Sequence, residues 1–320
     1  MIKFSPKSLT ITLAPWIFVF LWSTGFIGAK YGLPWAEPFT FLFYRMLLSI
    51  VVFFLLILIY KPAIPTNRRL IGHSVISGFL LHGAFLGGVF GSIKLGMSAG
   101  LGALIVGMQP LMTAVLAGPM LGDRVSRRQW IGLFLGMTGI IIVLGERAAT
   151  STGNSLFNGF GLGSLIMALT ALGGISFGTL WQKKYCAEVH PLTGAFMQYT
   201  ACAILFGVAA VSLEEMKVVW NLHFLLAMGW LVFGLSLTAI LLLMFLIKKG
   251  EATKTASLFF LVPPLTVLES YFLFDETLSF LAMLGVVISV SGVMVVISNP
   301  SRLIFRRIVR GHDDDGNQPN

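Results

Sequence analysis

Long apolar stretches follow one another along the whole chain, separated by short runs of charged and turn-forming residues. A helix that crosses a bilayer needs about 20 apolar residues, and the charged and turn residues divide this chain into ten stretches of about that length. We therefore predict ten membrane-spanning helices, at residues 12–32, 38–60, 70–93, 99–121, 129–145, 159–181, 192–213, 222–247, 252–274 and 279–298.

The first half of the chain recurs in the second half at an offset of 153 residues, which becomes 154 in the middle of each copy. Each copy holds five predicted helices, and two copies with an odd number of helices must lie upside down to each other in the membrane. We expect an all-α integral membrane fold with a first repeat at 12–145, a linker at 146–158, a second repeat at 159–298 and a tail at 299–320. The matched positions include Lys30 with Lys183, Pro38 with Pro191, Thr40 with Thr193, Lys94 with Lys248, Pro110 with Pro264, Gly132 with Gly285 and Gly139 with Gly292.

Composition agrees with a membrane protein, since 56% of the residues are hydrophobic and only 11% are charged. Such a surface could not be covered with polar atoms in water. The net charge of +9 does not indicate a nucleic-acid partner, because 17 of the 22 Lys and Arg residues fall on one side of the predicted helices. This bias follows the positive-inside rule and predicts that both termini are cytoplasmic.

Two charged residues lie inside predicted helices at similar depths. Arg45 is roughly 10 Å from the outer end of its helix, and Glu269 is roughly 8 Å from the same side. A charge in the bilayer centre costs at least ~3 kcal/mol on insertion scales, so such charges tend to pair or to face a water-filled cavity. We hypothesise that Arg45 and Glu269 face the interior and interact. Arg45 is either a structural clamp or a contact for a substrate anion, and Glu269 is either its partner or a residue that couples transport to a proton or cation.

Several polar and aromatic residues are expected near the midplane, where a substrate would be held. His82 could take part in coupling because it titrates near neutral pH, although a lone intramembrane histidine also serves as hydrogen-bonded structure. Pro110 and Pro264 each remove a helix hydrogen bond, and in lipid such breaks are tolerated mainly beside protein or a cavity. The other candidates, of which the aromatic ones either stack on a substrate or only pack, are Trp22, Gln109, Trp181, Tyr199, Ser236 and Thr238.

Small residues spaced four apart indicate close helix packing, because glycines let helix backbones approach in lipid. The chain has two cysteines, and no disulfide framework is implied. In the tail, His312 and three following aspartates are either a solvated end or a metal site, and we favour the former.

The ordered motifs resemble those of the EamA-type transporters of the drug/metabolite transporter superfamily, over about residues 16–298. The resemblance depends on the ordered set rather than on any one motif. Its elements are Leu21 to Phe26 with Lys30, Arg45, Pro110 with Leu111, Leu121 to Arg124, Gly132 with Gly139, and in the second copy Pro264 with Leu265, Phe274 to Glu276, and Gly285 with Gly292.

The chain departs from the family pattern at two positions. Asp123 stands where the family usually has glutamate, and Gln198 stands at the position equivalent to Arg45. Any function of Arg45 is therefore present in the first repeat only. We add Gln198 to the candidate residues of the substrate pathway. Asp123 and Glu276 lie just before the predicted fifth and tenth helices, where a carboxylate interacts favourably with the helix dipole; we interpret them as structural caps rather than substrate ligands.

The resemblance implies ten helices in two inverted repeats and a secondary transporter of small organic metabolites, most often an exporter of amino acids or related compounds, in the inner (plasma) membrane of a bacterium. The expected partners are a small-molecule substrate and the lipid bilayer, with no nucleic acid, no cofactor and no metal; a homodimer is left open. A membrane-embedded enzyme or lipid-linked carrier and a channel are the alternatives. Neither has its expected sequence features, such as an intramembrane pair of catalytic carboxylates or a repeated selectivity filter.

Overall fold

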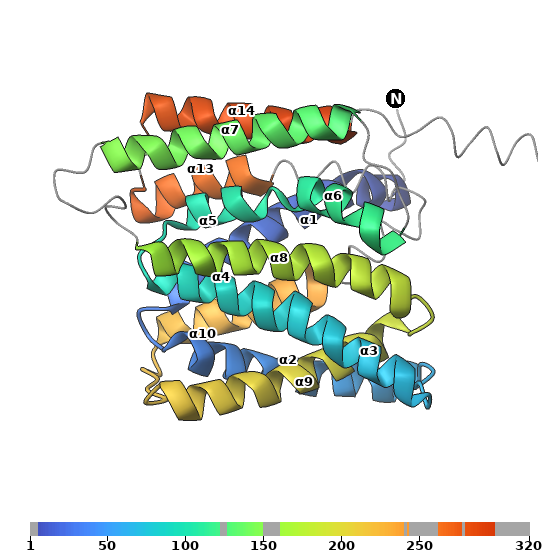
Figure 1. Ribbon diagram of the computed structural model, residues 1–320. Helices are drawn as coiled ribbons and strands as arrows, with labels where there is room; N and C mark the ends of the chain where they lie inside the picture. Colours follow the sequence, from blue (N-terminus) through green and yellow to red (C-terminus); the bar gives the residue numbers. More distant parts are fainter. Residues whose placement is uncertain are drawn as a thin grey trace, which may run out of the picture.

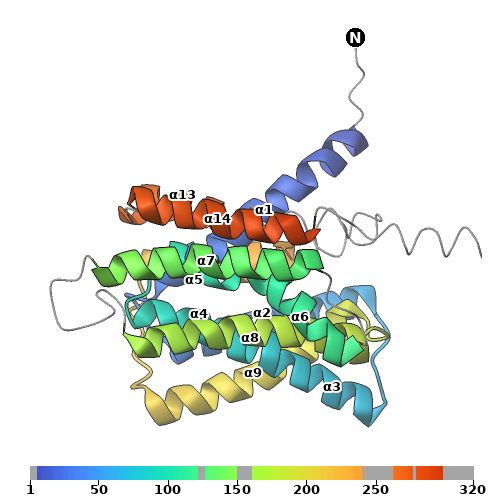
Figure 2. The ribbon, with the colours of Figure 1, turned by 45° about the horizontal axis from the view of Figure 1, so that its top comes forward.

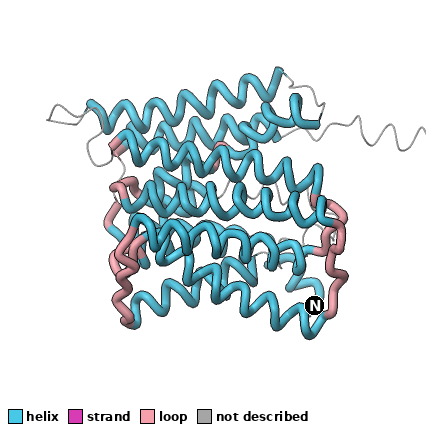
Figure 3. The backbone as a smooth tube through the Cα atoms, turned by 60° about the horizontal axis from the view of Figure 1, so that its bottom comes forward, coloured by secondary structure: helices cyan, strands magenta, loops and turns pink. Residues whose placement is uncertain are grey.

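The computed structural model describes residues 6–121, 127–149, 161–239, 242, 262–276 and 279–297. Within these ranges the regular secondary structure is helical, and the single β-bridge joins two loop residues, Ala36 and Val218. The helices lie roughly along one direction, and the loops gather at the two ends of the bundle (Figures 1 and 3). The elements are α1 (Pro6–Gly32), α2 (Pro38–Tyr60), α3 (Arg68–Gly78), η1 (Phe79–Ala84), α4 (Phe85–Lys94), α5 (Ala99–Val106), α6 (Gln109–Leu121), α7 (Arg127–Ala149), α8 (Leu162–Tyr185), α9 (Pro191–Leu213), α10 (Leu222–Gly229), η2 (Trp230–Ala239), α13 (Val262–Phe274) and α14 (Phe280–Ile297).

Local sequence explains where several helices begin. Pro38 and Pro191 open α2 and α9 at the first turn, where a missing N–H costs nothing. The side chains of Asn67, Ser98 and Asn221 accept hydrogen bonds from backbone N–H groups at the starts of α3, α5 and α10, as helix N-caps do.

Within the described part of the chain, five helical segments are long and apolar enough to cross a membrane on length and composition, and shorter apolar helices accompany them. The five are Pro38–Tyr60, Arg68–Lys94, Leu162–Tyr185, Pro191–Leu213 and Leu222–Ala239. The predicted helices at 222–247 and 252–274 are described only in part. α7 continues to Ala149, four residues into the predicted linker at 146–158, and residues 150–158 lie outside the described ranges.

Helices from the two halves of the chain pack in pairs. α7 lies along α14 in both Figure 1 and Figure 2, α2 packs against α9, and α5 packs against α13. The first two pairs join elements at equivalent places in the two repeats, so the same relation exchanges the two halves.

Glycine contacts reproduce this relation at the atomic level. A Cβ on Gly25 would lie 2.7 Å from Leu235 Cδ2, and a Cβ on Gly178 would lie 2.8 Å from Leu81 Cδ2. Gly178 follows Gly25 by 153 residues, and Leu235 follows Leu81 by 154. The two contacts are therefore equivalent, and the bundle has an approximate two-fold relation between its halves.

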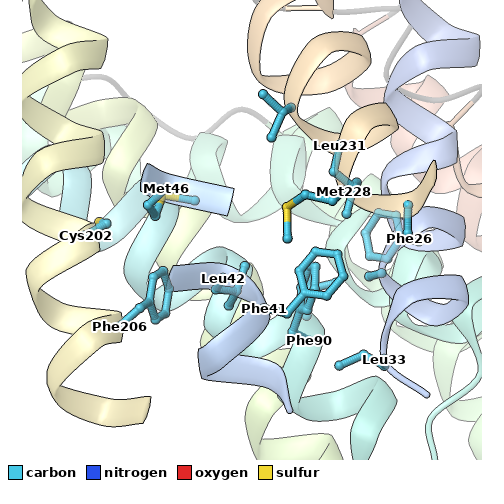
Figure 4. Packing of buried hydrophobic residues seen from close by; sticks show 14 of the residues in the cluster. Phe26, Leu33, Phe41, Leu42, Met46, Phe90, Cys202, Phe206, Met228 and Leu231 are labelled. Atoms are coloured by element: carbon cyan, nitrogen blue, oxygen red, sulfur yellow. The ribbon is translucent and has the colours of Figure 1, made fainter. Parts of the chain in front are cut away.

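A large apolar core fills the end of the bundle at which α1, α4 and α9 finish and α2 and α10 begin. Figure 4 shows Phe41, Leu42 and Met46 of α2 among side chains from α1, α4, α9, α10 and η2. Phe41 and Leu42 are completely buried. Such packing stabilises helix association in lipid through van der Waals contact.

Candidate substrate site

Arg45 is a buried charge with few partners. It lies on α2, one residue before Met46 of the apolar core, and its side chain is 4% exposed. Its Nη2 donates a hydrogen bond to Ser236 Oγ of η2 at 3.2 Å, whereas its buried Nε has no hydrogen-bond partner. No carboxylate of the described residues forms an ion pair with Arg45. A buried charge without a counter-ion is costly, which makes this side chain the most unusual in the described interior.

The half-buried His82 and the buried Gln198 form a second pair in this region. His82 Nε2 lies 3.2 Å from Gln198 Oε1, and the His82 ring centroid lies 4.4 Å from that of Tyr199. Tyr199 is 1% exposed and lies within electrostatic reach of Arg45 and hydrogen-bonding reach of Ser236. We call Arg45, His82, Gln198, Tyr199 and Ser236 the polar cluster.

The two hydrogen-bonded pairs of the polar cluster are equivalent under the internal repeat. Gln198 follows Arg45 by 153 residues, and Ser236 follows His82 by 154. The Arg45–Ser236 bond therefore corresponds to the Gln198–His82 bond, each linking the second helix of one repeat to the third helix of the other. The polar cluster therefore lies between the two halves of the chain, and their approximate two-fold relation exchanges its two hydrogen-bonded pairs.

Both third helices contain a π-helical segment at this point. His82 lies in η1 and Ser236 lies in η2. Because π-helical turns are rare and occur frequently at functional sites, their presence at equivalent positions beside one buried cluster distinguishes this region from the rest of the bundle. Neither segment was predicted from the amino-acid pattern.

Thr238, also in η2, does not join the polar cluster. Its hydroxyl donates to Phe233 O, five residues earlier, at 2.7 Å, and the side chain is exposed. Residues two apart on a helix do not face the same side, so Thr238 points away from Ser236.

Glu269 forms a separate buried site on α13. Ser23 Oγ of α1 donates to Glu269 Oε1 at 2.7 Å, and Oε2 is buried without a hydrogen-bond partner. The predicted interaction between Arg45 and Glu269 is not formed. The reason is that α1 packs against both α13 and η2, so Ser23 and Ser236 become the nearest partners of the two charges. Ser23 was missed, although it stands within the Leu21 to Phe26 motif.

The remaining pathway candidates lie elsewhere. Gln109 Nε2 donates to Thr179 Oγ1 of α8 at 3.2 Å. Trp181 packs 4.6 Å from the ring of Tyr185 on the same helix, and its Nε1 is buried without a hydrogen-bond partner. Trp22 lies 5.4 Å from the ring of Phe18. These three side chains are not part of the polar cluster.

The proline pair marks a helix interruption. The predicted helix at 99–121 is divided into α5 and α6, and Pro110 stands at the second residue of α6. Pro264 stands in the first described turn of α13. A Cβ on Gly107, in the interruption, would lie 2.4 Å from Pro263 Cγ, so the two proline-containing regions touch.

Glu276 is a cap, but for a different helix from the one predicted. Its carboxylate accepts hydrogen bonds from Ala99 N at 3.2 Å and Gly100 N at 3.4 Å at the start of α5, and it pairs with Lys30. A carboxylate at a helix N-terminus is stabilised by the dipole and the free N–H groups. Chain reversal after α13 brings Glu276 to α5 rather than to α14.

Asp123 and the tail with His312 lie outside the described residues. Among the residues that the structure does describe, no group of three His, Cys, Asp or Glu side chains is placed to hold a metal ion.

The comparisons with known proteins agree with this arrangement. The profile of the EamA-like transporter family matches residues 10–145 and 162–298. The chain is 25% identical over 303 residues to a probable amino-acid metabolite efflux pump of Escherichia coli, covering 91% of this chain and 95% of that protein. It is 26% identical over 310 residues to the uncharacterized transporter YvbV of Bacillus subtilis, and the match covers 91% of this chain and 92% of that protein. The inner membrane transporter YedA of Escherichia coli is 25% identical over 278 residues, with 86% of this chain and 87% of that protein covered.

A solved structure, titled only as the crystal structure of a protein, superimposes with a TM-score of 0.63 at 19% identity. It covers 95% of this chain and 99% of the other, so the fold is shared over nearly the full length.

These matches define the chain as a multi-pass membrane transporter of the inner membrane rather than an enzyme. It belongs to the EamA-like transporter family.

Proposed function

We propose that the protein is a secondary transporter that exports small organic metabolites, amino acids or related compounds, by alternating access around the polar cluster. The observation that carries the proposal is the equivalence of the Arg45–Ser236 and His82–Gln198 hydrogen bonds. A site contributed equally by two inverted repeats keeps its place when the repeats exchange conformations, which is how many secondary transporters open to each side in turn.

The proposal includes the finer architecture expected from the sequence. Ten membrane-spanning helices form two inverted repeats, 12–145 and 159–298, and both termini are cytoplasmic. Support comes from the equivalent glycine contacts, the paired packing of α7 with α14 and of α2 with α9, and the charge bias between loops. The name of one relative, a probable amino-acid metabolite efflux pump, supports the class of compound and the outward direction.

Resistance of cells to toxic metabolites tests substrate class and direction together. Cells that overproduce the protein are grown against a panel of amino acids, toxic amino-acid analogues and other small metabolites, with Arg45→Gln as the matched control at equal expression. We expect protection against at least one compound, and loss of that protection in the control. Equal growth with and without overproduction across the panel would contradict export of this class.

Reconstitution separates a carrier from a channel. Purified protein in liposomes should show saturable uptake and counterflow of the protective compound, because a carrier binds one solute in each cycle. Single-channel currents in a planar bilayer, together with uptake that fails to saturate, would instead identify a channel.

A further inference from the structure

The two halves of the polar cluster differ in charge, and this difference limits which ligands the cluster can bind. Its two hydrogen-bonded pairs are equivalent in position, but one contains a guanidinium and the other an imidazole and a neutral amide. Tyr199 adds a buried ring that packs on His82 and a hydroxyl within hydrogen-bonding reach of Ser236.

Arg45 brings donors that the protein leaves unused. A guanidinium has five N–H donors in a planar fork that fits a carboxylate in a bidentate manner. Among the described residues Arg45 donates one side-chain hydrogen bond, to a neutral hydroxyl, and its Nε is buried and unpaired. Since a side chain that is 4% exposed cannot rely on bulk water, an anion that binds here recovers much of the cost of burying the charge.

Two carboxylates of the second repeat are already engaged. Glu269 accepts from Ser23 on α1, and Glu276 binds Lys30 and the start of α5. Neither forms an ion pair with Arg45, so the matching anion has to come from outside the described part of the chain.

We propose that the transported molecule is a small organic carboxylate whose carboxylate group binds the Arg45 guanidinium, while the remainder of the molecule lies between His82, Gln198 and Tyr199. This inference rests on the proposed transport function and adds the chemical group that is recognised and the residue that recognises it. It also gives the substrate one orientation, because Gln198 stands where a second arginine would make the site symmetric.

The internal repeat supplies a sharp test of this orientation. Arg45→Gln makes both equivalent positions glutamine, and the double variant Arg45→Gln with Gln198→Arg moves the guanidinium to the other repeat. Arg45→Lys keeps the charge without the bidentate fork. Ser176→Ala is a control in the second repeat, outside the polar cluster. Elution as a monodisperse peak on size exclusion selects the variants that are folded.

The probes are the standard amino acids and their carboxamides, which differ only in replacing the carboxylate with a neutral amide. Efflux from proteoliposomes measures transport, and the thermal unfolding of the purified protein with each compound measures binding. We expect at least one amino acid to be transported and to stabilise the protein, with its carboxamide at least about tenfold weaker in both assays, since the carboxamide cannot form charge-assisted hydrogen bonds with the guanidinium. Arg45→Gln should remove this preference, Arg45→Lys should keep part of it, and the double variant should restore it.

The outcomes separate the inference from the proposed function. If carboxamides move as fast as amino acids, or if folded Arg45→Gln keeps the preference, carboxylate recognition by Arg45 is wrong while transport stands. If amino acids stabilise the protein through Arg45 but none is transported, the proposed function is wrong and the binding site stands. If none of the compounds binds or moves, both are wrong.

Discussion

The two repeats differ in the partners of two equivalent serines, Ser23 and Ser176. Ser23 of the first repeat is equivalent to Ser176 of the second, at an offset of 153, and Glu269 of the second is equivalent to Val115 of the first, at 154. Ser23 therefore donates to a carboxylate, whereas the buried hydroxyl of Ser176 has no hydrogen-bond partner. The scaffold is repeated, but only one of the two equivalent places carries a charge.

Packing contacts, by contrast, are shared by both repeats. A Cβ on Gly139 would lie 2.3 Å from Gly285 O, and a Cβ on Gly292 would lie 2.7 Å from Gly132 O. The two contacts are equivalent, because Gly292 follows Gly139 by 153 residues and Gly285 follows Gly132 by the same offset. The comparison teaches that close helix packing depends on glycines in both halves, while a buried carboxylate stands in one half only.

The largest effect is expected at the unmatched carboxylate. Glu269→Gln removes the ionisable group on α13 and, if Glu269 couples export to protons, uptake or efflux driven by a pH gradient should fall to the rate measured without a gradient. Counterflow, which needs no net proton movement, should continue. The measurement is flux in proteoliposomes with and without an imposed pH gradient.

Unchanged dependence on the gradient in the glutamine variant would exclude coupling through Glu269. Coupling would then be sought at His82, the other titratable candidate of the interior, through His82→Gln in the same assay.

The matched glycines should give the next largest effect, and it should be equal in both repeats. Gly139→Ala and Gly292→Ala each place a Cβ against backbone atoms of the partner helix, which cannot move aside as a side chain can. We expect each to destabilise the protein by about 1–3 kcal/mol. A Cβ on Gly173 of α8 meets nothing within 4 Å, so Gly173→Ala is the control. Thermal unfolding in detergent measures the three variants, and a stable Gly139→Ala protein would show that α7 and α14 are less tightly packed than described.

Much of the fold could be predicted because lipid imposes simple constraints. The predicted helix at 38–60 coincides with α2, and 192–213 differs from α9 by one residue, since apolar length and proline at the first turn set both ends. The π-helical segments could not be predicted in this way, because an extra residue in a helical turn leaves the apolar pattern of Phe79–Ala84 unchanged. Their equivalence in the two repeats appears only in the structure.

The polar cluster was predicted in part. Arg45, His82, Tyr199 and Ser236 were selected because charged, polar and aromatic residues at mid-depth are costly or unusual in a membrane, and Gln198 because it is equivalent to Arg45. The structure brings these five together. Their partners were assigned incorrectly where depth alone was used, since Arg45 and Glu269 have similar depths but are separated by the packing of α1. Depth along the helix axis gives only one coordinate of a side chain. Whether two charged side chains at one depth come into contact depends also on how the helices pack around them.

The smallest predicted effect comes from the two equivalent serines, and it tests the comparison most directly. Ser23→Ala leaves Glu269 Oε1 without its donor, and a cost of about 1 kcal/mol is expected because a buried acceptor loses its partner. Ser176→Ala removes a hydroxyl that is already buried and unpaired, so its stability should equal or exceed that of the unmodified protein. Thermal unfolding measures both. If Ser176→Ala costs as much as Ser23→Ala, Ser176 has a partner in function that this conformation does not contain, and the two repeats are more alike in their chemistry than Glu269 and Val115 imply.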